Sequence, residues 1–433
     1  MPASTRARST VSRRDFARLF AVGGSAALFS SPAWAREAGR APALPQGVPA
    51  SEADWAAVRA QFVMPPDLTV MNAANLCPAS RPVLEVLTRE TRSVDEDPSP
   101  MNRARLYPEK EQTRRALAEY LRATPDEIII TRNTSESNNL VSNGLDLGPG
   151  DEVIVHADNH PSNLQAWHAK ATRYGYTVVV VEQRNPHPGM AYYVDAFTRA
   201  MTPRTKVLAF THLSSTVGDL FPAAELCRVA RSRGVLTLVD GAQTFGLLDV
   251  DLAAMQPDFY TGSAHKWPCG ARECGVLYVR ADVQARLWPT IYSAYPGATG
   301  FSRSFEGFGQ RDEATMIAFR EALAFQTTIG RAAIEQRARA LAAQLLSGLA
   351  GLPGVRVWTT PTPALHAAVV SFVPGTLDAG RLATALYERD RIAITTRGGQ
   401  DRPGLRVSPH FYNSPAEIDR LLAALGRYLK TGV

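Results

Sequence analysis

A lysine and an acid stand at a spacing that could support chemistry on amino groups. Lys266 follows Asp240 by 26 residues, and Asp240 ends the apolar run Val235–Val239. Because Lys266 is flanked by His265 and Trp267, we expect its amine to be poorly hydrated, which lowers a lysine pKa and favours a nucleophilic amine. An acid at the end of a buried strand can keep a pyridine nitrogen protonated. The pair therefore predicts a site for pyridoxal 5′-phosphate (PLP), with Lys266 as the Schiff-base lysine.

Each of these residues also has a simpler explanation. Asp240 alone could cap the following helix, and a lysine after a strand is usually a solvated charge. We expect Asp258–Tyr260 to form a short strand and Thr261–Ser263 a turn, from which Ser263 and His265 can donate hydrogen bonds to a phosphate.

The runs Val239–Gln243 and Thr261–Lys266 resemble the class V aminotransferase family of PLP enzymes, which has fold type I. This family includes cysteine desulfurases, isopenicillin N epimerase-like proteins and sulfoxide lyases. The resemblance extends from about residue 70 to the C-terminus. It implies an α/β fold, with a large domain around a mainly parallel seven-stranded sheet and a smaller C-terminal α+β domain. It also implies a homodimer with the site at the subunit interface.

The resemblance assigns the cofactor contacts one position at a time. Thr134 and Ser135 match the phosphate-cup positions at a strand-to-helix turn, and a capping box there is compatible with that role. His160 matches the histidine that stacks on the ring, and Gln243 matches the residue that bonds the phenolic oxygen. The catalytic set is Lys266, Asp240 and His160, and the remaining expected cofactor contacts are Ser215, Ser263, His265 and Gln310, the last from the partner subunit.

Substrate contacts follow from the same resemblance. Arg406, in the expected strand Gly404–Val407, matches the arginine that pairs with a substrate carboxylate. Asn75 lies in a segment similar to one that covers the cofactor, and Arg397 is a second cation near the site. The entrance candidates are Arg103, Arg105 and Tyr107, although helix-surface charges are the simpler interpretation of both arginines.

Two departures bear on the branch of the family. Ser215 stands where desulfurases have an asparagine, which is closer to the epimerase-like branch, and Gln310 stands where many relatives have threonine. Desulfurases also need a mobile cysteine in the C-terminal third, but the four cysteines are Cys77, Cys227, Cys269 and Cys274. This argues against a persulfide-forming enzyme. Cys269 and Cys274 are expected to be structural thiols or one disulfide, and the sequence predicts no metal site.

These residues predict an enzyme of aminotransferase type that acts on an amino-acid or peptide amino group through the Lys266 Schiff base and a quinonoid-type carbanion. Epimerisation and β-elimination remain open alternatives. A non-catalytic binding protein on the same fold is an alternative of a different class, but the joint presence of Asp240, Gln243, Ser263, His265 and Lys266 argues against it.

The N-terminus predicts export. Ser12–Phe16 reads as a twin-arginine signal, and an apolar stretch and Ala33-Trp34-Ala35 follow it. Residues 1–35 are therefore expected to be a signal peptide read by the twin-arginine translocase, and residues 36–50 a linker. As an exported member of the family, the chain resembles in function the pyoverdine-maturation enzyme, which is also a twin-arginine substrate and modifies a glutamate side chain on a peptide siderophore. The expected compartment is the periplasm.

The charge balance excludes a nucleic-acid partner. The chain carries a formal charge of +6, of which the leader contributes +4 through five arginines and Asp15, so the mature chain carries about +2. The expected domains are 51–312, which holds the PLP site, and 313–433. The expected strands of the large domain are Ile128–Ile130, Glu152–His156, Thr177–Glu182, Lys206–Thr211, Val235–Val239, Asp258–Tyr260 and Gly275–Val279.

Overall fold

The structure is a computed structural model that describes residues 43–45, 47–292, 300–397 and 402–433. The predicted signal peptide, residues 1–35, lies outside the described residues. Residues 36–42 of the predicted linker also lie outside them. Among the helices that the structure describes, none combines the length and the apolar character needed to cross a bilayer.

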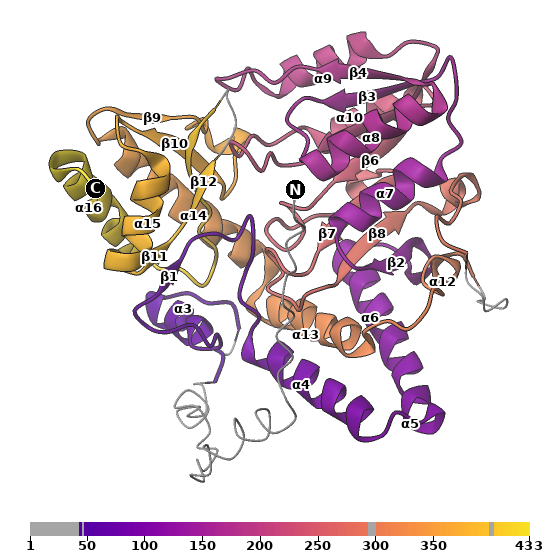
Figure 1. The fold of residues 1–433 in the computed structure, drawn as a ribbon, viewed down its shortest axis with the longest axis horizontal. Helices are drawn as coiled ribbons and strands as arrows, with labels where there is room; N and C mark the ends of the chain where they lie inside the picture. The colour runs from indigo at the N-terminus through magenta and orange to yellow at the C-terminus, as the bar shows by residue number, and fades with distance from the viewer. Residues whose placement is uncertain (1–42, 46, 293–299, 398–401) are drawn as a thin grey trace, which may run out of the picture. The chain divides into compact units, whose positions relative to one another are not determined.

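A seven-stranded sheet organises the larger part of the chain (Figure 1). Its order is β2-β8-β7-β6-β5-β3-β4, and all neighbours are parallel except β8, which is antiparallel to both β2 and β7. This confirms the predicted fold class. The strands are β2 (Ile128–Thr131), β3 (Glu152–His156), β4 (Thr177–Val181), β5 (Thr205–Thr211), β6 (Leu236–Asp240), β7 (Phe259–Ser263) and β8 (Gly275–Val279).

Alternate residues of these strands enter two different cores, as the two-residue period of a strand requires. Ile129 and Val153 pack in one core with Trp167, whereas Ile130 and Ile154 pack in the other. Because both faces are covered, the strands are continuous runs of apolar residues. The helices that connect them are α7 (Thr134–Gly144), α8 (Pro161–Tyr174), α9 (Met190–Ala200), α10 (Ala223–Ser232) and α11 (Leu252–Met255).

The expected turn at Thr261–Ser263 is wrong, because these residues are the second half of β7. Thr261 pairs with Asp240 of β6, and Ser263 pairs with Gly275 of β8. Only a glycine fits at position 262, because a Cβ there would lie 2.7 Å from the ring of Phe245. A run of Thr, Gly and Ser looks like a turn in isolation, but ladder bonds on both sides make it a strand.

A second helical layer contains α4 (Arg81–Glu96), α6 (Leu106–Leu121) and α13 (Glu313–Ile329), with α13 packed against the other two (Figure 1). Two short helices precede members of this layer in the sequence: α5 (Pro100–Ala104) precedes α6, and α12 (Phe301–Ser304) precedes α13. Arg114 of α6 and Glu306 form a fully buried, two-contact ion pair, which fixes α6 and the segment before α13 against β2.

The C-terminal part holds a four-stranded antiparallel sheet of order β12-β13-β10-β9. Its strands are β9 (Val355–Val357), β10 (Val370–Pro374), β12 (Thr395–Arg397) and β13 (Gly404–Val407), and its helices are α14 (Arg331–Ala350), α15 (Ala379–Asp390) and α16 (Pro415–Thr431). A separate parallel pair joins β1 (Thr69–Val70) to β11 (Ile392–Ala393).

The N-terminal helix α3 (Glu52–Arg59) packs on this C-terminal part. Glu52 forms an ion pair with Arg337 of α14, whose guanidinium also lies over the ring of Trp55. The division into domains 51–312 and 313–433 stays a prediction.

Candidate active site

A cavity of about 280 Å³ lies at the carboxyl ends of β6 and β7, where open α/β sheets bind ligands. Every predicted site residue except Gln310 lines it, and these residues come from both the large sheet and β13. They are Asn75, Thr134, Ser135, His160, Ser215, Asp240, Gln243, Ser263, His265, Lys266 and Arg406. Ala74, Asn133, Ser162 and Ala242 complete the wall.

Asp240 is buried at the end of β6, and three donors hold its carboxylate. Asn138 donates to Oδ2 over 2.9 Å, Asn163 donates to Oδ2 over 3.4 Å, and the backbone N–H of Ala242 donates to Oδ1 over 3.1 Å. These bonds replace the water that an ionised carboxylate loses on burial. The acid therefore has a fixed orientation inside the cavity.

The two asparagines are functional candidates that the sequence analysis missed. Thr261 donates to the amide oxygen of Asn138 over 3.1 Å, and Trp167 donates to that of Asn163 over 3.0 Å. Each amide oxygen is thereby occupied, so each NH₂ group turns toward Asp240. Asn138 and Asn163 lie inside helices, where asparagine is neutral or unfavourable, and that misfit was the one signal available from the sequence.

Lys266 follows β7 and reaches into the same cavity. Burial lowers the pKa of Lys266 to about 8, with the charge of Asp240 opposing the shift and that of Arg406 adding to it. Burial, together with the charges of Lys266 and Arg272, lowers the pKa of His265 to about 4. At neutral pH the site therefore holds a lysine with an accessible free-amine form beside a neutral histidine.

The N-terminus of α7 forms the opposite wall. Asn133 caps this helix by accepting from the backbone N–H of Glu136, so Thr134 and Ser135 are not the capping residues. The hydroxyl of Ser263 instead bonds both the N–H and the hydroxyl of Thr134, each over 2.8 Å. Hydroxyls and a helix N-terminus thus converge on one end of the cavity, which is an arrangement that binds phosphate.

His160 and Gln243 stand on further parts of the wall. The Nδ1 of His160 accepts from the N–H of Ser162 over 3.2 Å at the start of α8. Burial, followed by the charge of Lys266, lowers the pKa of His160. Gln243 donates to the carbonyl of Ala74 over 3.0 Å and accepts from the indole of Trp267 over 2.8 Å, so its side chain has a fixed position.

Arg406 of β13 brings a cation to the cavity. Its Nη1 donates to the carbonyl of Ser215 over 2.8 Å, while Nε is buried without a hydrogen-bond partner in the described part of the chain. Burial and the charge of Arg397 lower the pKa of Arg406 to about 10, so it stays cationic at neutral pH. Arg397 lies diagonally across from it on the same face of the sheet, because Thr395 pairs with Arg406.

Several sequence candidates lie away from the cavity. Gln310 is exposed and does not line the cavity of its own chain; its expected contact is with the cofactor of a partner subunit and stays a prediction. Arg103 pairs with Glu313 over 2.6 Å, and Arg105 pairs with Glu90 over 2.7 Å. The interpretation of both arginines as helix-surface charges is therefore the one that the structure supports. Tyr107 is 65% exposed.

All four cysteines are buried free thiols. Of the two expectations for Cys269 and Cys274, the structure has the free thiols and no disulfide between them. The prediction that no cysteine cluster could bind metal missed one grouping. Cys77 and Cys269 lie together with His410, although more than 130 residues separate each from the next along the sequence.

These features fit PLP. The cavity offers a partly desolvated lysine amine, a carboxylate held by three donors, a hydroxyl-lined helix N-terminus for the phosphate and an unpartnered guanidinium nitrogen. The fold and this set of groups define a lysine-dependent PLP enzyme of fold type I.

Comparisons with known proteins agree. The family model described as aminotransferase class-V matches residues 96–421. The chain is 35% identical over 390 residues to isopenicillin N epimerase of Amycolatopsis lactamdurans. This alignment covers 86% of this chain and 98% of the relative. It is 32% identical over 341 residues to a probable cysteine desulfurase of Xylella fastidiosa. This alignment covers 73% of this chain and 79% of the relative.

A solved structure shows the same fold. This structure is a lysine-to-alanine variant of C-DES, with glycine covalently linked to its PLP cofactor. It matches with a TM-score of 0.76 at 27% identity, over 85% of this chain and 98% of that one. The protein belongs to the class V aminotransferase family of PLP-dependent enzymes.

Proposed function

We propose that this enzyme transfers the amino group of an amino acid or of an amine on a peptide, with Lys266 as the group that moves the α-proton. The observation that carries the proposal is the cavity that joins Lys266, whose pKa lies at about 8, to Asp240 and Arg406. A base with a pKa near neutrality can take and return a proton at physiological pH.

Each wall residue has a distinct task in this proposal. PLP, when bound, supplies an aldehyde that condenses with amines and a ring that accepts electrons from the adjacent carbon. Thr134, Ser135 and Ser263 would hold its phosphate, Asp240 its ring nitrogen and Gln243 its phenolic oxygen. The remaining assignments are His160 against the ring face, with Ser215 and His265 as further polar contacts.

Arg406 orients the substrate. Its unpartnered Nε and its remaining N–H groups can bind a carboxylate, and Asn75 lies on the same wall. A carboxylate anchored at Arg406 would hold the α-carbon inside the cavity that Lys266 also lines. Lys266 Nζ would then take the proton from the α-carbon and not return it there, since that carbon becomes the carbonyl carbon of the product.

The titratable groups favour transfer over inversion of the α-carbon. Inversion needs a proton from the face opposite Lys266. Among the described residues that line the cavity, the remaining groups are two histidines that are neutral at pH 7, the permanently charged Arg406, and Asp240, whose carboxylate is held by three donors. One proton-moving group suffices for amino transfer.

Epimerisation is the second candidate, because the chain is 35% identical to an isopenicillin N epimerase along nearly the whole of that protein. In that case a water molecule or His160 would deliver the second proton. β-Elimination is the third candidate, since a cystine C–S lyase, C-DES, has a similar structure at 28% identity. All three reactions begin with the same proton removal by Lys266.

Export and dimerisation form part of the same proposal. The run Ser12–Phe16 and the short apolar stretch after it support passage of the folded enzyme to the periplasm through the twin-arginine translocase. A secreted peptide, such as a siderophore precursor that carries a glutamate residue, would then be the substrate. The exposed position of Gln310 is compatible with a contact to the cofactor of a second subunit.

The test uses the purified enzyme in D₂O with a panel of amino acids and glutamate-containing peptides, beside Lys266→Ala. Amino transfer predicts a new carbonyl product and a change in the cofactor absorbance band. Epimerisation predicts deuterated substrate of inverted configuration without a carbonyl product, and elimination predicts release of a side-chain fragment. Absence of deuterium exchange at every α-carbon, in enzyme that holds the cofactor, would refute the role of Lys266.

A further inference from the structure

Three potential metal ligands meet in the core behind the active-site lysine. The two Sγ atoms of Cys77 and Cys269 and a ring nitrogen of His410 all lie within 4.8 Å of one another. The exposed fractions of these residues are 2%, 1% and 0%. None of them lines the cavity described above, so the proposed amino-group chemistry does not use them.

The imidazole of His410 has unused ligand capacity. One nitrogen, Nε2, bonds the carbonyl of Trp267 over 2.7 Å, while Nδ1 is buried with no partner among the described residues. Because a carbonyl only accepts, Nε2 carries a hydrogen, and in the neutral ring Nδ1 keeps a free lone pair. A buried polar atom without a partner costs free energy, and a bound ligand would remove that cost.

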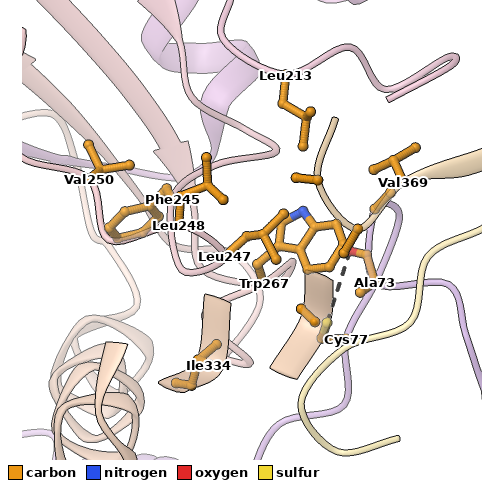
Figure 2. Packing of buried hydrophobic residues seen from close by; sticks show 14 of the residues in the cluster. Ala73, Cys77, Leu213, Phe245, Leu247, Leu248, Val250, Trp267, Ile334 and Val369 are labelled. Carbon is orange, nitrogen blue, oxygen red and sulfur yellow. Dashed lines mark hydrogen bonds between the residues drawn. The ribbon is translucent and has the colours of Figure 1, made fainter. Parts of the chain in front are cut away.

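The sulfur atoms of the two cysteines make only long hydrogen-bond contacts. Cys77 Sγ reaches the carbonyl of Ala73 at 4.0 Å and the hydroxyl of Tyr412 at 3.7 Å. Cys269 Sγ reaches the carbonyl of Trp267 at 3.7 Å. Figure 2 shows Cys77 beside the indole of Trp267, with its contact to Ala73 drawn as a dashed line. Such long contacts leave both sulfurs able to ligate a soft cation.

We propose that Cys77, Cys269 and His410 form a closed binding site for one monovalent thiophilic cation, Cu(I). Two sulfurs and one imidazole are soft or borderline ligands that favour Cu(I) and Zn(II) over Mg(II) or Ca(II). Structural Zn(II) sites are four-coordinate, whereas this cluster has three ligand residues in the described part of the chain.

Charge also favours the monovalent ion. Both thiols are buried, and a buried charge is costly unless it is paired, so a cation that needs only one thiolate is favoured. Cu(I) needs one thiolate for neutrality, whereas Zn(II) needs two. One S–H bond breaks and its proton passes to water, a Cu–S bond forms, and no electron is transferred.

The site is linked to the segment that carries the catalytic lysine. Cys77 donates its backbone N–H to the carbonyl of His265 over 2.8 Å, and Cys269 donates its own to that of Lys266 over 3.0 Å. His410 bonds the next carbonyl, that of Trp267. Each proposed ligand residue thus donates a hydrogen bond to one of three successive carbonyls. A cation bound to all three residues would restrict the motion of the turn around Lys266.

The first test is a competition experiment with PLP-loaded enzyme under anaerobic conditions. Cu(I) is supplied as its acetonitrile complex against bicinchoninate, a chromophoric chelator. We expect the wild type to withdraw one Cu(I) per chain, and X-ray absorption at the copper edge to show two sulfurs and one nitrogen. Cys77→Ser and Cys269→Ser should each bind at least about 100-fold more weakly.

The matched controls are Cys227→Ser and Cys274→Ser, which remove equally buried thiols outside the cluster and should bind Cu(I) as the wild type does. The cofactor absorbance band of each variant reports whether it has folded. The proposal is overturned if the wild type competes no better than Cys77→Ser, or if it binds Zn(II) but not Cu(I). A Cys77–Cys269 disulfide in the purified protein, found by peptide mapping, would also overturn it.

Discussion

Asn138 donates a hydrogen bond to Asp240 over 2.9 Å, from the middle of α7 to the end of β6. Asn138 is 1% exposed, so the bond has no competition from water. The residue that would face the ring nitrogen is therefore positioned by a helix whose N-terminus would bind the phosphate. One helix thus aligns two ends of the same ligand.

Asn138→Ala should lower kcat/KM by about 10- to 100-fold, because a hydrogen bond to a charged group contributes about 1.5–3 kcal/mol. The cofactor should still bind, since Lys266 and the phosphate contacts are intact. Steady-state kinetics with the cofactor content measured in parallel separates the two effects. The control is Asn139→Ala on the neighbouring position, where the side chain bonds Lys170 instead. Equal activity of the two variants would contradict this role of Asn138.

Capture of PLP by the cofactor-free enzyme should depend on the protonation of Lys266. The free amine is the nucleophile, so the rate should rise as the pH increases through about 8, the pKa that burial gives this lysine. Stopped-flow absorbance measures the rate directly. Asp240→Asn removes the charge that raises this pKa, so the midpoint should move to lower pH. A midpoint that stays near the pKa of an exposed lysine, about 10.4, would show that the amine is not desolvated.

Arg406→Gln should raise KM by about 10- to 100-fold for substrates with a free carboxylate beside the reacting amine, through loss of a charge-assisted pair. A smaller change in kcat is expected, because Lys266 still moves the proton. Arg356→Gln is the control, since Arg356 is an exposed arginine of the same sheet. If the amides of these substrates lose as much as the free acids, the carboxylate is not the partner of Arg406.

Most of the central sheet could be predicted from the sequence because its strands are short, mainly apolar runs bounded by polar residues. Glu152–His156 and Gly275–Val279 have the predicted bounds in the structure. Thr261–Ser263 could not be predicted, since its residues favour turns and only pairing with β6 and β8 makes them a strand. The motif around Lys266 was recognisable because its residues are contiguous.

The residues that support the site were beyond sequence reasoning. Asn138 and Asn163 act on Asp240 from positions 102 and 77 residues away, and their one local signal, an asparagine inside a helix, does not show what they contact. The same holds for Cys77 and His410, whose proximity to Cys269 depends on how three separate segments pack. These groups lie together only through long-range packing, whereas the sequence motif predicted only the residues of the turn around Lys266.

The buried pair of Arg114 and Glu306 gives a prediction about stability. Its two contacts measure 2.7 and 2.9 Å, and Glu306 also accepts from the backbone N–H of Ile130 over 2.7 Å. Glu306→Gln keeps the volume but removes the more deeply buried counter-charge of Arg114 and leaves it with Glu111, whose contact is longer at 3.2 Å. The free energy of unfolding should fall by about 3–5 kcal/mol, measured as a lower urea midpoint of the PLP-loaded protein.

Glu225→Gln is the matched control for this substitution. It breaks a pair with Arg228 in which both side chains are exposed, and such pairs contribute little because water and salt screen them. Its urea midpoint should remain that of the wild type. Equal midpoints for Glu306→Gln and Glu225→Gln would mean that solvent reaches Arg114, so that α6 is not fixed to β2 through this pair.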